Sequence, residues 1–380
     1  MATILAIETS CDETAAAVVQ GDGAALAVAR ANVIASQVAI HAEYGGVYPD
    51  VAAREHVKNI VPVIELSLRE AGLITNHESR IKHRSTMTQK AFGGIDALAV
   101  TVGPGLIGSL LVGTNAAAML ADLSGLPIIP INHWEGHLYS VFLKNTTHAE
   151  IQTPTPKFPI LFLTVSGGHT SLILMRDHFS YEVLGKTIDD AAGEAFDKCA
   201  RLLGLGYPGG PALSREAALA RSSNRESRTA NQASLTLPRP MLNSGDLNFS
   251  FSGLKTAVRY AIERGEINPN EPASREAAAR ETEDAIVDVL LKKTAVAVHQ
   301  YQPTTVAIVG GVSANHELRR RAREELATPD SRFAIRLADR PFTTDNAAMI
   351  GAAGLFRLIK HTGVFTSPSD IEANASLRLT

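Results

Sequence analysis

One pattern occurs twice in the chain: an apolar run, a polar turn and a second apolar run, each short enough for a strand of a β-hairpin. It spans residues 4–19 near the start of the sequence and residues 160–175 near its middle. When the two segments are overlaid, Ser10, Asp12, Glu13 and Thr14 fall on Ser166, Gly168, His169 and Thr170. A hairpin that recurs once in each half of a chain predicts two lobes built on one plan.

Helical and strand patterns alternate around these hairpins. Helical spacing covers residues 51–72 and 281–300, a strand–turn–helix pattern covers 97–123, and an apolar strand pattern covers 305–309. This alternation predicts an α/β fold with mainly parallel sheets covered by helices. A length of 380 residues is about right for two such domains.

The expected domain organisation follows from these patterns. We expect a first lobe over residues 1–132, a second lobe over residues 133–345, and a C-terminal helix within residues 346–380 that returns toward the first lobe. Three polar stretches interrupt the pattern, at residues 75–94, 144–157 and 221–232. Their composition predicts surface insertions. The first is mildly basic, and contact of this insertion with RNA phosphates is the alternative interpretation.

Bulk composition limits the function classes. The chain has two cysteines, Cys11 and Cys199, no basic leader before the first apolar run, and a formal net charge of −3. We therefore expect a cytoplasmic protein without disulfides, in which any RNA contact needs a local basic patch or partner proteins. Residues 97–121 carry no charge and are long enough to span a membrane. A Gly-Pro-Gly triplet at 103–105 interrupts them, so a buried strand–turn–helix is expected instead.

Two histidines have the spacing of metal ligands. His133 and His137 are four residues apart, which places both imidazoles on one face of a helix, where they can bind one metal ion. The alternative is that a histidine of the pair forms hydrogen bonds in a core. Glu135 is about 200° around the helix from His133, not where a zinc-peptidase helix places its base. Asp345, at the start of a small-residue helix, is a candidate third ligand, an N-cap, or both.

Two glycine turns follow strand patterns in the second half, with glycine pairs at 167–168 and 310–311. There, backbone N–H groups can approach phosphate or carboxylate oxygens, or a nucleotide base can stack, with Asn315 as a hydrogen-bonding group. Most such turns are only turns, so neither is decisive alone. Glu194 and Asp197 share one helix face at i and i+3, which suits ribose hydroxyls, although a solvated acidic face is the simpler interpretation of the pair.

Taken together and in this order, the motifs are specific. The runs that carry a resemblance are Glu8-Thr9-Ser10-Cys11-Asp12-Glu13-Thr14, Gly45-Gly46-Val47-Tyr48-Pro49, Gly103-Pro104-Gly105-Leu106, His133-Trp134-Glu135-Gly136-His137, Val165-Ser166-Gly167-Gly168-His169 and Thr344-Asp345-Asn346. With the two hairpins and the late Gly-Gly turn, the chain resembles the superfamily of actin, sugar kinases and heat-shock ATPases. This implies two actin-like α/β lobes with a central cleft. Within the superfamily, the chain is similar to the TsaD family, related to the KEOPS catalytic subunit, over nearly its whole length apart from the insertions.

The resemblance implies a metal-dependent tRNA N6-adenosine threonylcarbamoyltransferase. Such an enzyme transfers the threonylcarbamoyl group from threonylcarbamoyl-AMP to the adenosine 3′ of the anticodon in tRNAs that read ANN codons. The implied metal ligands are His133, His137 and Asp345, with Fe²⁺ as the first candidate ion and Zn²⁺ as the second. The positions implied to hold the adenylate are Thr164, Val165, Ser166, Gly167, Gly168, Asp197, Gly210 and Asn315. The implied partners are TsaB-like and TsaE-like proteins, the former on the first-lobe face that includes helix 51–72.

Some points stay open at this stage. Archaeal relatives carry a tyrosine metal ligand where this chain has Thr164, so a three-residue ligand set is implied here. Asp12 and Glu13 are hypothesised as the catalytic groups that accept the amine proton or orient the substrate. The alternatives to a transferase are, in order, an ATPase or kinase of the same fold, a non-catalytic scaffold and a metallopeptidase.

Overall fold

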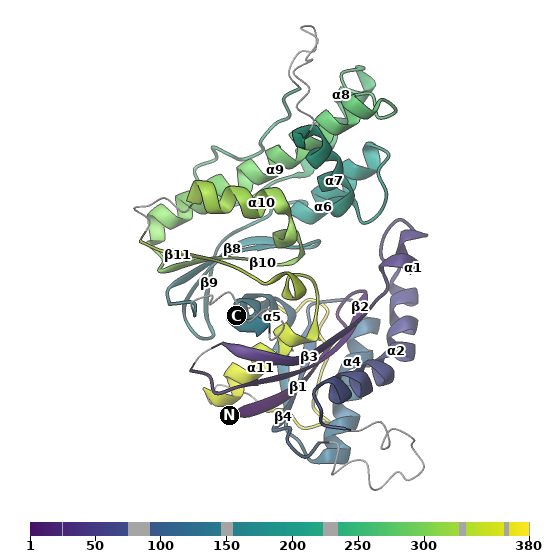
Figure 1. Ribbon diagram of the computed structural model, residues 1–380, viewed down its shortest axis with the longest axis vertical. Helices are drawn as coiled ribbons and strands as arrows, with labels where there is room; N and C mark the ends of the chain where they lie inside the picture. Colours follow the sequence, from purple (N-terminus) through teal and green to yellow (C-terminus); the bar gives the residue numbers. More distant parts are fainter. Residues whose placement is uncertain are drawn as a thin grey trace. The chain divides into compact units, whose positions relative to one another are not determined.

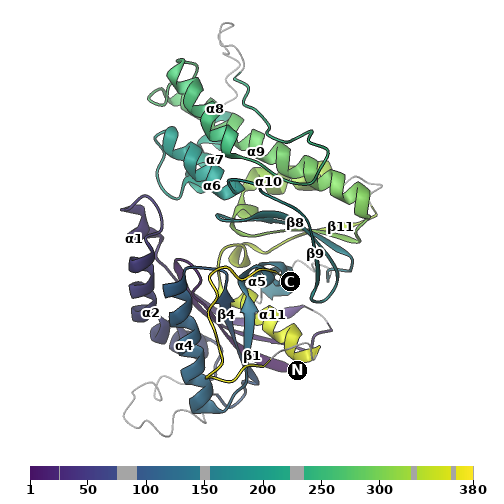
Figure 2. The same ribbon diagram turned by 180° about the vertical axis from the view of Figure 1, so that it is seen from behind.

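The computed structural model describes residues 1–24, 26–74, 92–145, 155–222, 235–326, 332–360 and 365–379 (Figures 1 and 2). The chain divides into two compact units. Unit 1 comprises Met1–Pro156 and Ala338–Thr380, and unit 2 comprises Lys157–Leu337. Most of the expected insertions at 75–94, 144–157 and 221–232 lies outside the described residues.

Unit 1 is built on a mixed sheet. Its described strands lie in the order β5-β4-β1-β2-β3-β6. β1, β2 and β3 are antiparallel neighbours, and the other pairs are parallel. The strands are β1 (Ala2–Glu8), β2 (Glu13–Gly21), β3 (Ala27–Ser36), β4 (Ala97–Gly103), β5 (Ile128–Asn132) and β6 (Leu143–Asn145). The helices are α1 (Val38–Ala42), α2 (Pro49–Glu70), α4 (Ile107–Ser124), α5 (His133–Tyr139), η1 (Ser140–Phe142), η4 (Arg340–Phe342) and α11 (Ala347–Ile359).

Unit 2 repeats this plan around a second mixed sheet. Its described strands lie in the order β11-β10-β7-β8-β9. β7, β8 and β9 are antiparallel neighbours, and β10 is parallel to both β7 and β11. The strands are β7 (Ile160–Val165), β8 (Thr170–Asp177), β9 (Ser180–Lys186), β10 (Thr305–Val309) and β11 (Ala334–Leu337). The helices are α6 (Ala192–Leu202), α7 (Gly209–Ser222), α8 (Ser252–Glu263), α9 (Pro272–Tyr301), η2 (Gly311–Ala314), α10 (His316–Arg321) and η3 (Ala322–Leu326).

The repeated hairpin is confirmed, and among the described strands parallel pairs outnumber antiparallel ones, although both sheets are mixed. β1–β2 in unit 1 and β7–β8 in unit 2 are the two hairpins, and each has a parallel strand, β4 or β10, beside its first strand. A third strand, β3 or β9, continues each hairpin in the antiparallel direction. β3 was not predicted, because its burial is irregular along the strand and gives no clear alternation.

The unit boundaries differ from those expected at 132/133 and 345/346. The chain stays in unit 1 after β5 because α5 packs against α11 and β6 pairs with β3. It returns to unit 1 at Ala338, ahead of Asp345. These contacts join segments that are far apart in sequence, so local patterns could not place the boundaries.

The two faces of the unit 1 sheet pack against different helices (Figures 1 and 2). Leu5 and Ile7 of β1 belong to an apolar cluster that includes residues of α2 and α4. The alternate residue Ile4 faces α11 on the other side. A Cβ added to Gly354 of α11 would lie 2.7 Å from the Cβ of Ala99, so glycine lets this helix lie close to β4.

The uncharged stretch at 97–121 forms a strand–turn–helix, as predicted, because it becomes β4 and α4. Among the described residues, α4 is the helix that is long and apolar enough to cross a membrane by length and composition alone. It packs on β4 and α2 in unit 1, where Leu110 and Ala117 are buried. Its opposite side is apolar and exposed, through Ile107, Leu111, Met119 and Leu123.

Candidate metal centre and substrate positions

Two histidines lie where β5 runs into α5. Asn132 ends β5 and caps α5, because its side-chain oxygen accepts a hydrogen bond from the Trp134 backbone N–H at 2.9 Å. His133 and His137 are therefore about one turn apart on the buried side of α5, with exposed fractions of 7% and 2%. The i, i+4 helical spacing predicted from the sequence is confirmed.

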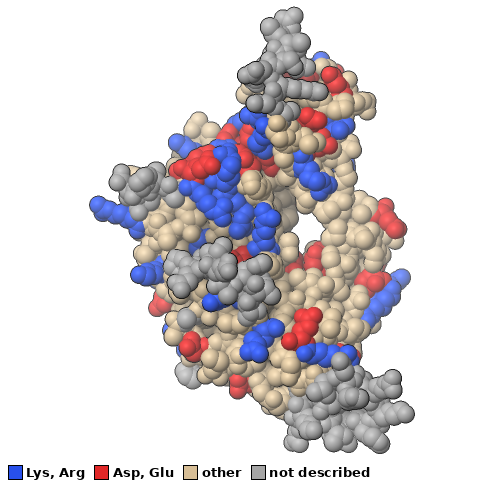
Figure 3. Space-filling model, viewed as in Figure 1, with Lys and Arg blue, Asp and Glu red and all other residues tan. Residues whose placement is uncertain are grey.

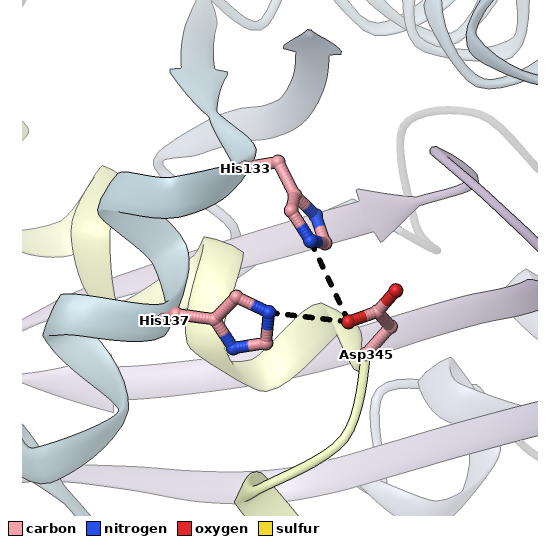
Figure 4. A group of neighbouring side chains, drawn as sticks. All are labelled: His133, His137 and Asp345. Atoms are coloured by element: carbon pink, nitrogen blue, oxygen red, sulfur yellow. Dashed lines mark ion pairs between the residues drawn. The ribbon is translucent and has the colours of Figure 1, made fainter. Parts of the chain in front are cut away.

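Asp345 lies in the segment that leads into α11. The cap of this helix is Asn346, whose side-chain oxygen accepts a hydrogen bond from the Met349 backbone N–H at 3.0 Å. Asp345 is therefore not the N-cap, and its carboxylate faces the imidazoles of α5 instead (Figure 4).

The three side chains form one compact group (Figure 4). Asp345 Oδ1 lies 3.5 Å from His133 Nε2 and 3.2 Å from His137 Nε2. One ligand atom from each residue lies within 4.8 Å of the other two. Two imidazoles and a carboxylate arranged in this way can hold one divalent metal ion and leave positions open for substrate oxygens.

The hydrogen bonding of the two imidazoles fits a metal ion. Within the described part of the chain, neither ring nitrogen of His137 has a hydrogen-bond partner, although both are buried and Nε2 approaches Asp345. His133 is held from its other side, since its Nδ1 lies 3.0 Å from Glu8 Oε2 and 3.0 Å from Ser10 Oγ. Buried polar nitrogens without partners are rare. A cation bound by the Nε2 atoms of both imidazoles accounts for His137 Nε2.

The ionisable groups of this site shift one another's pKa values. Burial opposes charge on His133, but the Asp345 and Glu8 carboxylates outweigh it and raise the pKa of this imidazole well above its ordinary value. Burial would likewise raise the pKa of Asp345, but the His133 and His137 imidazoles hold it well below the usual range. Asp345 is therefore ionised, as a metal-binding carboxylate must be.

Asp12 and Glu13 lie in and just after the β1–β2 turn of the same unit. Asp12 is buried, and burial together with the Asp345 and Asp12 carboxylates raises the pKa of Glu13 to about 10. Acids that crowd one another in this way can hold a proton at neutral pH, which is a property of catalytic carboxyl groups. Their catalytic role stays a prediction.

The first glycine turn of unit 2 follows β7. Thr164 pairs with Val309 at the end of the parallel strand β10, so this turn and the turn at 310–311 leave the same edge of the sheet. Ligands of open α/β sheets bind at such carboxyl ends. The Thr164 hydroxyl is buried and has no hydrogen-bond partner among the residues that the structure describes, so it is available to a ligand only after a local movement.

The turn itself is closed by its own backbone. The Ser166 N–H donates to the His169 carbonyl at 2.8 Å, and the His169 N–H donates to Ser166 Oγ at 3.1 Å. A Cβ added to Gly167 or Gly168 would meet none of the described residues within 4 Å. The described residues thus leave the outer side of this turn unobstructed, as an anion-binding turn requires.

Asp197 and Gly210, two further positions implied to hold the adenylate, are neighbours in the structure. The Gly210 N–H donates to Asp197 Oδ1 at 3.1 Å. Burial raises the pKa of Asp197 in spite of this hydrogen bond. Glu194, the residue paired with Asp197 in the sequence, forms an ion pair with Lys198 at 2.7 Å instead. A shared ribose-binding role for the two acids stays a prediction.

Asn315 is engaged within unit 2. Its side-chain oxygen accepts from the Leu318 N–H at 2.8 Å and so caps α10. Its Nδ2 lies 2.7 Å from Glu283 Oε1 and 2.8 Å from Ser214 Oγ. The amide is thus oriented by a buried carboxylate, and its expected contact with a nucleotide base stays a prediction.

Sequence reasoning missed two residues of these sites. Glu8 contacts His133, and its signal in the sequence is an acid at the end of a fully apolar strand. Ser313, which follows the second glycine turn, has a buried hydroxyl without a hydrogen-bond partner in the described ranges of the chain. Local patterns of the kind that reveal a helical histidine pair cannot reveal either residue, because both depend on neighbouring strands.

Two sheets built around repeated hairpins define an α/β protein with two actin-like lobes, and the His-His-Asp group at the carboxyl end of β5 is a candidate metal centre. The chain matches the family model described as TsaD, tRNA N6-adenosine threonylcarbamoyltransferase, over residues 29–352. The chain belongs to this family and is a transferase.

Curated relatives agree over nearly the full length. A tRNA N6-adenosine threonylcarbamoyltransferase of Thermomicrobium roseum is 43% identical over 99% of this chain and 96% of the relative. One from Moorella thermoacetica is 42% identical over 94% of this chain and 92% of the relative. Among solved structures, full-length HypF in a phosphate- and nucleotide-bound form matches 98% of this chain and 47% of its own, with 12% identity and a TM-score of 0.52. That likeness concerns the fold alone.

Proposed function

We propose that this protein transfers the threonylcarbamoyl group from threonylcarbamoyl-AMP to N6 of the adenosine 3′ of the anticodon in tRNAs that read ANN codons. The observation that supports the proposal best is the His133, His137 and Asp345 group, found in a chain of the TsaD family. An ATPase or kinase of this fold holds Mg²⁺ largely through phosphates and has no need of two imidazole ligands.

The chemistry suits the residues of the chain. A mixed acyl-phosphate anhydride already carries a good leaving group, so the enzyme must position the amine, stabilise the carbonyl oxygen and neutralise the phosphate. The metal ion supplies Lewis-acid polarisation when it is bound. Asp12 accepts the amine proton or orients the substrate, whereas Glu13, whose raised pKa keeps it protonated at neutral pH, orients the substrate. The open backbone of the turn at 166–169 binds the adenylate, together with Thr164, Asp197, Gly210 and Asn315.

The identity of the ion is a further part of the proposal. We assign Fe²⁺ first, from the resemblance to the family, with Zn²⁺ as the alternative. Two imidazoles and one carboxylate accommodate either ion, so the ligand set does not choose between them. Metal analysis of protein purified without oxygen decides this point.

The proposed partners of this protein are a TsaB-like and a TsaE-like protein. The apolar outer sides of α2 and α4 support a protein partner, because the two helices pack side by side and expose Val57, Val61, Ile107 and Leu111. An exposed apolar surface on adjacent helices is typical of a protein interface. A TsaB-like protein is the occupant we assign to it, and we place the protein in the cytoplasm.

We expect tRNA binding to need positive charge from partner proteins in addition to that of this chain. Figure 3 shows Lys and Arg gathered on unit 2 near α10, with acidic side chains next to them. Arg320 pairs with Glu317 at 2.6 Å, and Arg321 pairs with Asp288 at 2.8 Å. These arginines are neutralised within the protein. Partner proteins that add positive charge fit this balance better than a strong basic field on this chain alone.

A single-turnover assay tests the proposal. Purified protein, TsaB-like and TsaE-like partners, threonylcarbamoyl-AMP and unmodified ANN-decoding tRNA are mixed, and modified adenosine is measured. We expect product from wild type, loss of at least about 100-fold in rate for His133→Ala and Asp345→Ala, and no loss for the exposed-histidine control His299→Ala. Wild type that binds metal and partners but forms no product would favour an ATPase or scaffold.

A further inference from the structure

Beyond the metal ligands themselves, we propose that Glu8 is the positioning residue that fixes the orientation and tautomer of His133 and so sets the metal affinity of the centre. The proposal rests on the metal centre of the proposed function. It concerns a residue that touches neither substrate nor metal and acts through an imidazole.

Glu8 is fully buried at the end of β1, with an exposed fraction of 0%. One oxygen, Oε1, accepts the backbone N–H of Ser10. The other, Oε2, accepts the hydroxyl of Thr101 from the neighbouring parallel strand β4 at 2.6 Å. A carboxylate held by one donor from the turn after β1 and another from β4 has a fixed position, and a fixed acceptor can orient a third group.

His133 is that third group. Its Nδ1 lies 3.0 Å from Glu8 Oε2, while its Nε2 faces Asp345 Oδ1 at 3.5 Å. Because Glu8 Oε2 acts as an acceptor, Nδ1 carries a proton and donates it. The lone pair of the neutral ring is then on Nε2, on the side where the other two ligand residues lie. Carboxylate–histidine–metal arrangements orient ligands in this way.

The two imidazoles differ in this respect. Among the described residues, no acceptor contacts His137 Nδ1, so this ring has no counterpart of the Glu8 contact that selects the tautomer of His133. It is held by burial beside α11, where Gly136 lies against Ile350 and Met349. Glu8 therefore acts on one ligand of the pair, and its substitution should weaken metal binding without removing the site.

The simpler explanation is that Glu8 only stabilises the β1–β2 turn through Ser10. Two variants separate the explanations. Glu8→Gln keeps the size of the side chain but places an amide beside Nδ1, which favours the wrong tautomer. Thr101→Val removes a donor to the same oxygen and leaves the Glu8–His133 contact in place. A structural role predicts similar effects from both variants, whereas a positioning role predicts a specific effect of Glu8→Gln.

The experiment measures Zn²⁺ and Co²⁺ affinity of the full-length protein by chelator competition, the visible spectrum of the Co²⁺ form, and thermal unfolding of the metal-free form. We expect Glu8→Gln to bind both ions about 10- to 100-fold more weakly, with an altered Co²⁺ spectrum. Thr101→Val should bind both ions as wild type does, within a factor of about three. Folded Glu8→Gln with wild-type affinity, or equal losses in both variants, overturns the proposal.

The outcomes also separate this inference from the proposed function. Wild-type protein that binds neither ion overturns both. Wild-type protein that binds metal through a Glu8-dependent site but forms no modified tRNA overturns the transferase proposal and leaves the role of Glu8 standing. A transferase whose metal affinity is insensitive to Glu8→Gln overturns the inference alone.

Discussion

Glu135 and Arg357 form a two-bond ion pair that joins the helices next to the metal centre. Arg357 Nε lies 2.7 Å from Glu135 Oε1, and Nη2 lies 2.6 Å from Oε2. The carboxylate is 2% exposed. Both of its oxygens are occupied, and it projects away from the metal-facing side of α5. Glu135 therefore cannot serve as the base of a metallopeptidase, as its position in the sequence already indicated.

The first prediction concerns this pair. Arg357→Met leaves a buried carboxylate without a partner and should lower the free energy of unfolding by about 3 kcal/mol or more. Glu135→Gln combined with Arg357→Met should cost less than the sum of the single substitutions, since neither charge is then left alone. Urea unfolding of the two single variants and the double variant measures this coupling. Additive losses would show that the pair does not join α5 to α11.

The second prediction concerns His56 of α2, which holds the β1–β2 turn. Its Nε2 lies 3.0 Å from the Cys11 carbonyl oxygen and donates to it, and its Nδ1 accepts from Thr14 Oγ1 at 2.7 Å. Burial lowers the pKa of His56, so it stays neutral in the folded state. In the unfolded chain, the His56 imidazole binds a proton near pH 6.5. The contribution of His56 to the free energy of unfolding is therefore fully present above about pH 6.5 and is lost as the pH falls toward the lower pKa of the folded state.

Replacement of this histidine tests the assignment. His56→Gln retains a side-chain N–H for the Cys11 carbonyl but does not titrate. Its free energy of unfolding, measured in urea between pH 5 and 8, should decrease less steeply on acidification than that of wild type. The difference between the two curves cancels the titration of the metal ligands, which both proteins share. Parallel curves would exclude a neutral His56 in the folded protein.

The third prediction concerns the glycine turn after β10. Gly310 has φ +91°, and a Cβ there would lie 2.4 Å from the Val165 carbonyl oxygen. Gly310→Ala should destabilise the protein by about 1–3 kcal/mol or more, because it adds a clash to a left-handed backbone. Gly311→Ala is the matched control, since a Cβ at that position meets nothing within 4 Å. Equal melting temperatures of the two variants would contradict the argument.

The sequence predicted those features that depend on local spacing. His133 and His137 were found because an i, i+4 pair stays on one face wherever the helix packs. Strand β10 was predicted with its observed bounds, since a short apolar run between Pro303 and Gly310 leaves few alternatives. Helix α9 begins nine residues earlier than the predicted residue 281, at Pro272, because its first turns are charged and alanine-rich and lack an apolar period.

Features that depend on pairing between distant segments were not predicted. Glu8 reaches His133 only because β1, β4 and β5 are adjacent in the sheet. The amide of Asn315 is occupied by Glu283, a residue of α9 that no local pattern connects to it. The exposed apolar side of α4 was also missed, since an uncharged helix gives no sign of which residues face the core.

The last prediction concerns that exposed side. Val61 of α2 and Leu111 of α4 are 55% and 47% exposed, and a partner helix that covered them would bury both. Val61→Lys and Leu111→Lys should each weaken binding of a TsaB-like protein at least about tenfold, because a lysine at the centre of an apolar interface must be desolvated. Leu219→Lys, on α7 of unit 2 and 51% exposed, is the matched control. Isothermal titration with each folded variant measures the affinities. Wild-type affinity of both interface variants would place the partner on another surface, whereas a loss with the control as well would indicate a general effect of added charge.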